Sequence, residues 1–357
     1  MRNFTVGPVQ SPPCVHEIGA QDVPYFRTPE FSATMLEAER SALSLAGAPA
    51  GSRAVFLTGS GTAGMEAAVM NLLSPRDRAL VVDGGSFGRR FAQICAIHGV
   101  PHERIPLEPG RALRPAHLAP FAGRGFTALL VNMHETSTGV LYDMPMIADF
   151  CRREGLFLLV DAISAFLADP FDMAALGAGA MVAGSQKAMA CPPGVSLLAL
   201  APAALARVAA GDPKCLYFDL KAALKDGERG QTPFTPAVGT LLQIHARLRE
   251  IEAAGGAASE IARTAALAAD FRARIADLPL DNLSESPSNA VTALRVRNRS
   301  ARAVFSALKD RYGIWICPNG GELADDVFRV GHLGALDPAD NAALAAALHD
   351  LHSSGLF

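Results

Sequence analysis

The sequence predicts an α/β protein with a large domain built on a mainly parallel, doubly wound β-sheet and a small C-terminal α+β domain. Strand-length apolar runs alternate with segments of helical periodicity up to about residue 200, the pattern of successive β-α-β units. Runs such as residues 156–160 are apolar at every position, as expected of strands buried on both faces of a parallel sheet. The chain has 357 residues, which fits two domains better than one.

The expected domain boundaries follow from changes in this pattern. Residues 1–16 contain several prolines and are expected to form an extended N-terminal arm. Residues 17–250 form the large domain and residues 251–357 the small one. The boundary is placed near residue 250, shortly before Gly255 and Gly256, which separate two long helical segments.

The order of elements supports this division. In the large domain we expect helix 31–46, strand 54–58, a glycine-rich turn at 59–64, helix 65–73, strands 79–82 and 128–132, helix 144–154, strand 156–160, a short helix at 171–177, strands 180–183 and 196–200, turns over 211–233, and helix 237–254. Helix 258–276 begins the remainder, which continues with strand 289–296, helix 300–311, strands 313–317 and 327–330, and helix 337–352.

The turn at 59–64 joins a strand to a helix start, so its backbone N–H groups face a space suited to an anion. The hydroxyls of Ser60 and Thr62 add donors beside Gly61. Glycine-rich turns also allow close packing, so the turn is either an anion-binding cradle or a packing element. The turn lacks the G-x-x-x-x-G-K-[ST] pattern, which disfavours a P-loop nucleotide hydrolase.

Lys187 follows the apolar run 180–183, and a buried ammonium is costly unless it is paired or neutral. The chain has only five lysines and none precedes Lys187, so arginine usually supplies positive charge. A neutral amine suits Schiff-base chemistry. Asp161 ends the neighbouring apolar run, and active sites of open α/β sheets lie at such strand ends. Together they match pyridoxal 5′-phosphate (PLP), with Lys187 on the aldehyde and Asp161 on the ring nitrogen. A surface lysine is the alternative.

Other candidates lie at further strand ends or in loops. Phe87 is placed to stack on a planar ring, although a core aromatic is the alternative. A polar cluster occupies residues 134–139. Arg329 lies in an apolar strand, where it binds a substrate carboxylate or makes a structural salt bridge. Arg27 either faces a pocket or belongs to a solvated loop.

Composition excludes several other classes. The 32 basic and 35 acidic residues give a net charge of −3, which gives no indication of nucleic-acid binding. The six cysteines are scattered without a C-x-x-C pair, so we expect reduced thiols, a cytoplasmic location and no metal site. No apolar run reaches membrane-spanning length, and the N-terminus lacks a signal-peptide core.

With these pieces assembled, the chain resembles the class V aminotransferases of the fold-type I PLP enzymes. Within that family it is similar to alanine–glyoxylate, serine–pyruvate and 2-aminoethylphosphonate–pyruvate aminotransferases. The resemblance runs from about residue 4 to residue 351. It depends on S-G-T at 60–62, H-E-T-S-T-G at 134–139, V-D at 160–161, G-S-Q-K at 184–187, P-P-G at 192–194 and R-V-G at 329–331.

The resemblance implies a role for each candidate. Lys187 forms the Schiff base with PLP and Asp161 pairs with the pyridinium nitrogen. The remaining cofactor contacts are Ser60, Gly61 and Thr62 at the phosphate, Gln186 beside the lysine, Phe87 stacked on the ring, and Thr136 near the ring's 3′-oxygen. Arg329 binds the acid group of the substrate. Thr235 lies where relatives reach the phosphate of the partner subunit's PLP, which implies an obligate homodimer with shared active sites.

The expected activity is therefore transamination from a small amino donor to a 2-oxo acid such as pyruvate or glyoxylate. Alanine, serine and 2-aminoethylphosphonate remain open as donors, because the fork of Arg329 fits a carboxylate and a phosphonate alike. Arg27 would add a second positive charge for a phosphonate. A PLP-dependent lyase or cysteine desulfurase of the same fold is the alternative. A desulfurase needs a thiol on a mobile loop, whereas Cys317 is expected to be buried at a strand end.

Overall fold

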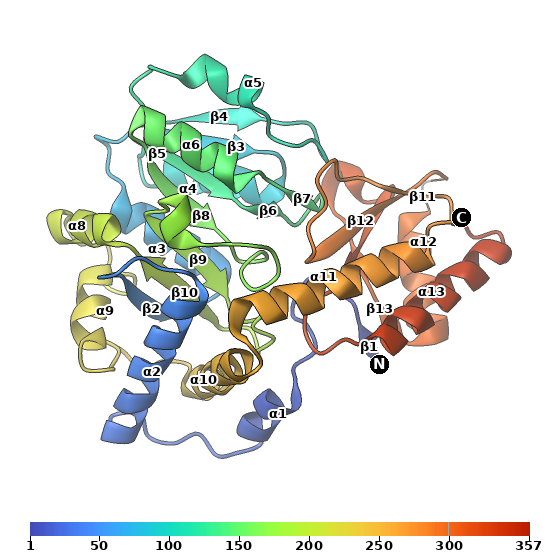
Figure 1. Cartoon of the computed structure of the whole chain (residues 1–357), viewed down its shortest axis with the longest axis horizontal. Coiled ribbons are helices and arrows are strands. Elements are labelled where there is room, and N and C mark those ends of the chain that lie inside the picture. Colours follow the sequence, from blue (N-terminus) through green and yellow to red (C-terminus); the bar gives the residue numbers. More distant parts are fainter. Residues whose placement is uncertain (299) are drawn as a thin grey trace.

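A seven-stranded sheet forms the centre of the large part of the computed structural model, which describes residues 1–298 and 300–357 (Figure 1). Its strand order is β2-β10-β9-β8-β5-β3-β4. The strands are β2 (Arg53–Thr58), β3 (Ala79–Asp83), β4 (His102–Pro106), β5 (Ala128–Asn132), β8 (Phe157–Asp161), β9 (Ala180–Gly184) and β10 (Val195–Leu200). Only β10 runs against its neighbours, β2 and β9. The other strands share one direction, so the prediction of a mainly parallel sheet is confirmed.

Alternate residues of the central strands belong to two separate hydrophobic clusters. In β8, Leu158 and Val160 pack in one cluster, while Phe157 and Leu159 pack in the other. Because successive side chains of a strand point to opposite faces, this pattern requires helices on both sides of the sheet. The sheet is therefore doubly wound, as its fully apolar strands predict.

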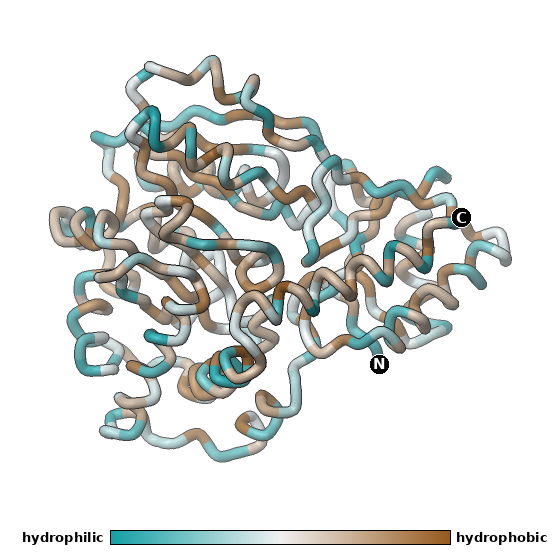
Figure 2. The backbone as a smooth tube through the Cα atoms, in the orientation of Figure 1, coloured by the Kyte–Doolittle hydropathy of each residue, from teal (hydrophilic) through white to brown (hydrophobic). Residues whose placement is uncertain are grey.

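The helices that cover the sheet divide accordingly. One face contacts α2 (Pro29–Leu45), α6 (Met144–Glu154), α7 (Met173–Leu176) and α10 (Val238–Ala253), and the other contacts α3 (Gly61–Leu72), α4 (Ser86–Ile97), α8 (Pro202–Ala210) and α9 (Leu220–Gly227). In Figure 2, α10 carries apolar and polar colours in alternation along its turns. Its buried residues include Leu241, Ile244 and Leu248, the spacing of an amphipathic helix.

The C-terminal part has its own sheet and core. The sheet order is β11-β12-β15-β14, with β11 (Leu280–Asn282), β12 (Val291–Val296), β14 (Cys317–Pro318) and β15 (Val327–Gly331). Helices α11 (Gly256–Arg274), α12 (Ala301–Tyr312) and α13 (Pro338–Ser353) cover it. Figure 1 shows α11 running from the large part to the small one. A third hydrophobic cluster fills this part and takes Leu267 and Phe271 from α11.

The N-terminal arm crosses between the two parts. Strand β1 (Arg2–Asn3) pairs in parallel with β13 (Ile314–Trp315), and Phe4 is buried in the C-terminal cluster. The short helix α1 (Pro13–Gly19) then packs against α10. It spans the expected end of the arm at residue 16, and the sequence pattern predicts no helix there.

Several smaller elements also lie outside the predicted pattern. The expected turns over 211–233 contain α9, whose first turn is capped by the Asp219 side chain. The expected strand 313–317 is divided into β13 and β14, which belong to different sheets. The remaining short elements are α5 (Pro115–Leu118), β6 (His134–Glu135), β7 (Val140–Leu141) and the 3-10 turns at Ala119–Phe121 and Gly321–Leu323. In the described part of the chain, no helix is both long and apolar enough to span a membrane.

Candidate active site

The candidate site lies along the edge of the large sheet where the co-directional strands end. Ser60 follows β2, Phe87 follows β3, Thr136 follows β5, and Asp161 and Lys187 stand at and just after the ends of β8 and β9. Strands β8 and β9 are hydrogen-bonded neighbours. The prediction that Asp161 and Lys187 lie at neighbouring strand ends is therefore confirmed.

Lys187 is only 8% exposed. Its Nζ donates a hydrogen bond to the backbone oxygen of Val6 in the N-terminal arm, at 2.5 Å. Burial is the main cause that lowers the pKa of this amine to about 8, and the positive charge of Arg329 lowers it further. Asp161 acts in the opposite direction. With a pKa of about 8, roughly a tenth of Lys187 is uncharged at pH 7, far more than for a lysine at the ordinary pKa of 10.5, and this favours its use as a nucleophilic amine.

Asp161 is 5% exposed, and its Oδ1 accepts a hydrogen bond from the backbone N–H of Ile163 at 2.8 Å. Burial raises the pKa of this carboxyl to about 7, and the nearby charge of Glu135 adds to the effect. The positive charge of Lys187 opposes it. A buried acid of this kind favours a cationic partner, such as a protonated ring nitrogen, because the partner would compensate its charge.

The turn after β2 has the features of an anion cradle. Ser60 is the N-cap of α3, and its side chain makes no capping hydrogen bond, so the first N–H groups of the helix have no side-chain acceptor. Arg90 donates to Thr62 Oγ1 at 2.9 Å and brings a positive charge to the same turn. A Cβ on Gly61 would lie 2.5 Å from Ile163 Cδ1, so a side chain at this position would require the Ile163 side chain to move.

These residues fit PLP on two further observations. Gln186 Oε1 is buried and has no hydrogen-bond partner within the described part of the chain, so it is free to accept from a bound group. The helix start of α3, the ring of Phe87 and the pair Asp161 and Lys187 offer an anion site, an aromatic surface and the two polar groups that a pyridine aldehyde requires.

Thr136 belongs to a small buried hydroxyl cluster. Its Oγ1 lies 2.8 Å from Ser164 Oγ, which also lies 2.9 Å from His134 Nδ1. Burial lowers the pKa of His134 to about 3, so the ring is neutral at ordinary pH. Ser164 is a site residue that the sequence pattern did not indicate, although its position three residues after Asp161 was a usable signal.

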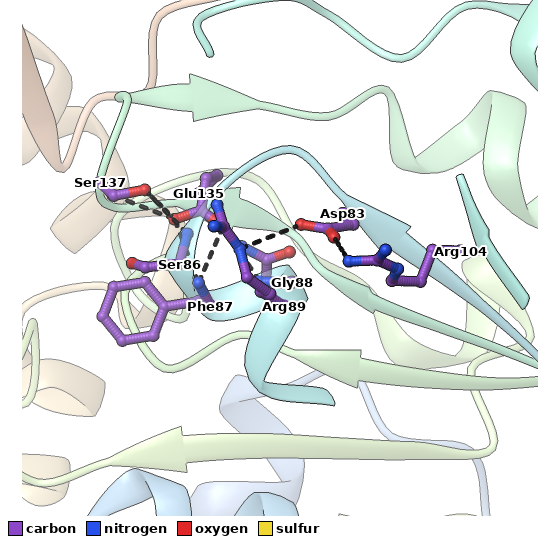
Figure 3. A network of polar contacts seen from close by, with 9 residues as sticks. Asp83, Ser86, Phe87, Gly88, Arg89, Arg104, Glu135 and Ser137 are labelled. Carbon is purple, nitrogen blue, oxygen red and sulfur yellow. Dashed lines mark hydrogen bonds and ion pairs between the residues drawn. The ribbon is translucent and has the colours of Figure 1, made fainter. Parts of the chain in front are cut away.

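Glu135 belongs to the polar cluster at residues 134–139, in which the sequence pattern indicated no separate role for this position, and it is fully buried. Figure 3 shows its carboxylate beside Ser137 and the turn of Ser86, Phe87 and Gly88. The backbone N–H groups of Phe87 and Gly88 both donate to Glu135 Oε2 at 3.1 Å. Phe87 is half-buried, and the Arg90 guanidinium lies 4.8 Å from the centre of its ring.

Arg329, from β15, reaches this edge from the small part of the molecule. Its Nη1 donates to the Thr136 backbone oxygen at 3.2 Å and its Nη2 to the Pro318 oxygen at 2.8 Å. Its partners in the described chain include no carboxylate, which argues against the structural salt bridge considered above. One expectation is wrong: Cys317 is half-buried rather than buried. It lies in the two-residue strand β14, and its Sγ accepts from Arg329 Nη2 at 3.1 Å.

Two candidates lie away from this cluster. Arg27 is exposed and donates from Nη1 to Gln231 Oε1 and to the Thr232 oxygen, at 3.2 and 2.8 Å. Thr235 is also exposed and lines a cavity beside β2 that includes Thr58. Neither shares a hydrogen-bond partner with Arg329 within the described residues.

Metal binding was not expected from the sequence. Among the described residues, no group of three or more His, Cys, Asp or Glu side chains is arranged to hold a metal ion.

Comparison with known proteins identifies the family. The model of the class V aminotransferase family matches residues 25–326. A protein of Anabaena cylindrica named as the 42 kDa subunit of a soluble hydrogenase is 31% identical, over 82% of this chain and 78% of its own. The L-aspartate–glyoxylate aminotransferase of Paracoccus denitrificans is 30% identical, over 80% of this chain and 74% of its own.

Among solved structures, pyridoxamine–pyruvate aminotransferase from Mesorhizobium loti superimposes with a TM-score of 0.93 at 25% identity, covering 99% of this chain and 92% of that one. The shared fold extends over both parts of the molecule and includes the sheet edge that carries the candidate site. The chain therefore belongs to the class V aminotransferases, the PLP-dependent transaminases of fold-type I.

Proposed function

We propose that this aminotransferase moves an amino group from a small amino acid or aminophosphonate to a 2-oxo acid such as pyruvate or glyoxylate, with PLP as its cofactor. The observation that carries the proposal is the pair of Lys187 and Asp161 at neighbouring strand ends, both buried and with pKa values shifted towards neutrality. The acceptors are supported by the names of two similar proteins, which contain glyoxylate and pyruvate. The donor remains one of alanine, serine and 2-aminoethylphosphonate.

In this mechanism, bound PLP supplies an aldehyde for the donor's amino group and a ring that accepts the electron pair left when the donor carbon loses its proton. Lys187 is the residue that holds the cofactor between turnovers and moves that proton. The Val6 backbone oxygen keeps the free amine directed into the site. Asp161 would stabilise the proton on the ring nitrogen. Because Asp161 is buried, its charge is poorly solvated and would be compensated by that protonated nitrogen.

Arg329 is the proposed binding group for the substrate's acid. Its guanidinium is oriented by hydrogen bonds to the backbone oxygens of Thr136 and Pro318. Backbone oxygens have no formal charge, so they leave the positive charge of Arg329 unneutralised. The cation is therefore free to pair with a carboxylate or phosphonate in both half-reactions. Arg27 makes its polar contacts with residues 231–233, which favours a role in shaping that segment over direct contact with a phosphonate.

A homodimer with shared active sites and a cytoplasmic location remain part of the proposal. The segment that carries Thr235 borders a surface with unusually exposed apolar side chains, including Val23 at 63% and Leu216 at 79%. Large exposed apolar groups of this kind are typical of interaction surfaces. Ile251 still belongs to a large-part hydrophobic cluster, whereas Leu267 belongs to the C-terminal one, which favours a boundary slightly later in the chain than residue 250.

The lyase or desulfurase alternative is less favoured. A desulfurase thiol must travel to its substrate on a loop. Cys317 instead belongs to β14, within the small sheet, and its sulfur contacts Arg329.

A half-reaction screen tests the proposal. Purified protein is loaded with PLP, each candidate donor is added alone, and the visible absorbance of the bound cofactor is followed. We expect one or more donors to abolish the band, and pyruvate or glyoxylate to restore it. Borohydride should fix PLP to Lys187, and Lys187→Ala should lose turnover. Full turnover by Lys187→Ala would refute the assignment, and a response to 2-aminoethylphosphonate alone would select the phosphonate donor.

A further inference from the structure

The Glu135 carboxylate is a buried group whose partners are all neutral donors. It is 0% exposed and accepts from Asn132 Nδ2 at 2.8 Å, from the N–H groups of Phe87 and Gly88, and from the N–H and Oγ of Ser137. Five donors match an ionised carboxylate, which only accepts hydrogen bonds. By contrast, the nearby Asp83 pairs with Arg104 and Arg89 (Figure 3).

Two of those donors, the N–H groups of Phe87 and Gly88, belong to the first turn of α4. The N-cap of this helix is Gly85, which has no side chain to satisfy the free N–H groups. The Glu135 carboxylate acts as the cap instead, although Glu135 lies 48 residues after Phe87 in the chain. An anion at a helix N-terminus is also favoured by the helix dipole. Glu135 therefore fixes where α4 begins relative to the end of β5.

The packing around this turn leaves little freedom. A Cβ on Gly85 would lie 2.4 Å from Glu135 Cδ, and one on Gly88 would lie 2.3 Å from the Val82 backbone oxygen. The two glycines allow the backbone to approach the carboxylate on one side and β3 on the other. The backbone around Phe87 is therefore packed between the Glu135 side chain and strand β3.

The same turn leads to the candidate cofactor contacts. The Phe87 ring faces Arg90, which is one helical turn further along α4 and donates to Thr62 Oγ1. A displacement of the first turn of α4 would therefore move the Phe87 ring. Glu135 needs no contact with the cofactor to have this effect.

We propose that Glu135 is a positioning residue for the cofactor site: its carboxylate holds the first turn of α4 and thereby orients the ring of Phe87 for stacking on the pyridine ring. This inference rests on the proposed function. It extends that function by assigning a role to a residue that binds neither cofactor nor substrate.

A double-mutant cycle on PLP affinity tests the inference, with Glu135→Gln, Phe87→Ala and the double variant prepared free of cofactor. The dissociation constant of PLP is measured by absorbance titration. We expect Glu135→Gln and Phe87→Ala each to weaken binding on the order of tenfold. The double variant should be no weaker than Phe87→Ala, because Glu135 acts through Phe87. Glu108→Gln, which removes an exposed carboxylate, is the matched control and should bind normally.

The outcomes separate the two proposals. Unchanged affinity in Glu135→Gln, or additive losses in the double variant, would overturn the positioning role while PLP binding by the wild type leaves the proposed function intact. Failure of the wild type to bind PLP would remove both. If Glu135→Gln does not fold, the same cycle with Ser137→Ala decides the matter, because the Ser137 hydroxyl bonds both Glu135 and the Ser86 N–H. A coupled loss supports the role, and an additive loss or none refutes it.

Discussion

Replacing Asp161 by asparagine should stabilise the cofactor-free protein at alkaline pH while it damages the active site. The Asp161 carboxyl is 5% exposed and its pKa is raised from 3.8 to about 7, mainly by burial. Between these two pH values the folded protein holds a proton that the unfolded chain releases. The stability of the wild type therefore falls as pH rises through this window, and the loss is complete above about pH 7. Asparagine keeps the Oδ1 acceptor for Ile163 and removes the titration.

The size of the effect follows from the two pKa values. They differ by about three pH units, and each unit corresponds to about 1.4 kcal/mol, so full ionisation of Asp161 costs the folded state up to about 4 kcal/mol. At pH 5 roughly 1–2 kcal/mol of this cost is already present. The advantage of Asp161→Asn over the wild type should therefore grow by roughly 2–3 kcal/mol between pH 5 and pH 8.

Urea unfolding of the cofactor-free proteins, followed by circular dichroism at one fixed protein concentration, measures this difference. Asp149→Asn is a suitable control, because the Asp149 side chain is 58% exposed and its removal should give a difference that varies little with pH. A difference between Asp161→Asn and wild type that stays constant, or that shrinks as pH rises, would refute the reasoning. With PLP bound, Asp161→Asn should turn over far more slowly than the wild type.

Three further predictions concern substrate binding, assembly and the cradle. Arg329→Lys should raise KM for donor and acceptor alike by about tenfold, because lysine cannot make the bidentate contact; wild-type KM values would return Arg329 to a structural role. Mixing inactive Lys187→Ala with inactive Thr235→Ala protomers should restore part of the activity if active sites are shared, and a native mass of one chain would contradict the dimer. Gly61→Ala should weaken PLP binding measurably, because its methyl group would lie 2.5 Å from Ile163 Cδ1. A second change, Ile163→Ala, should recover part of that loss; unchanged affinity in Gly61→Ala would show that the cradle tolerates a side chain.

The sequence pattern predicted the large sheet because strands buried on both faces form continuous apolar runs, as in residues 157–160 of β8 and in β9. It also located Asp161 and Lys187, since a charged residue directly after such a run is conspicuous. It missed α1 and α9, which are short and depend on tertiary contacts and a local cap rather than on a long periodic pattern.

Contacts between residues that lie far apart in the chain could not be predicted from the sequence pattern either. Glu135 belongs to a motif that was noted, but its role depends on the N–H groups of Phe87 and Gly88, and backbone groups have no residue-type signature. The same holds for the Val6 oxygen that receives Lys187 Nζ. The half-buried state of Cys317 and its contact with Arg329 likewise depend on tertiary packing, which the residue types in the strand do not specify.

The pairing of β1 with β13 has a consequence for how the chain acquires its structure during synthesis. Phe4 bonds through its backbone to Trp315 and Gly331, so this residue finds its partners only after about 300 further residues have been synthesised. At about 5–20 residues per second, the arm waits on the order of tens of seconds before those partners exist. Until then Lys187 lacks the Val6 acceptor, and its amine remains accessible in a partly folded large domain. The surroundings of Lys187 are therefore complete only after the C-terminal part has been made and the arm has paired with it.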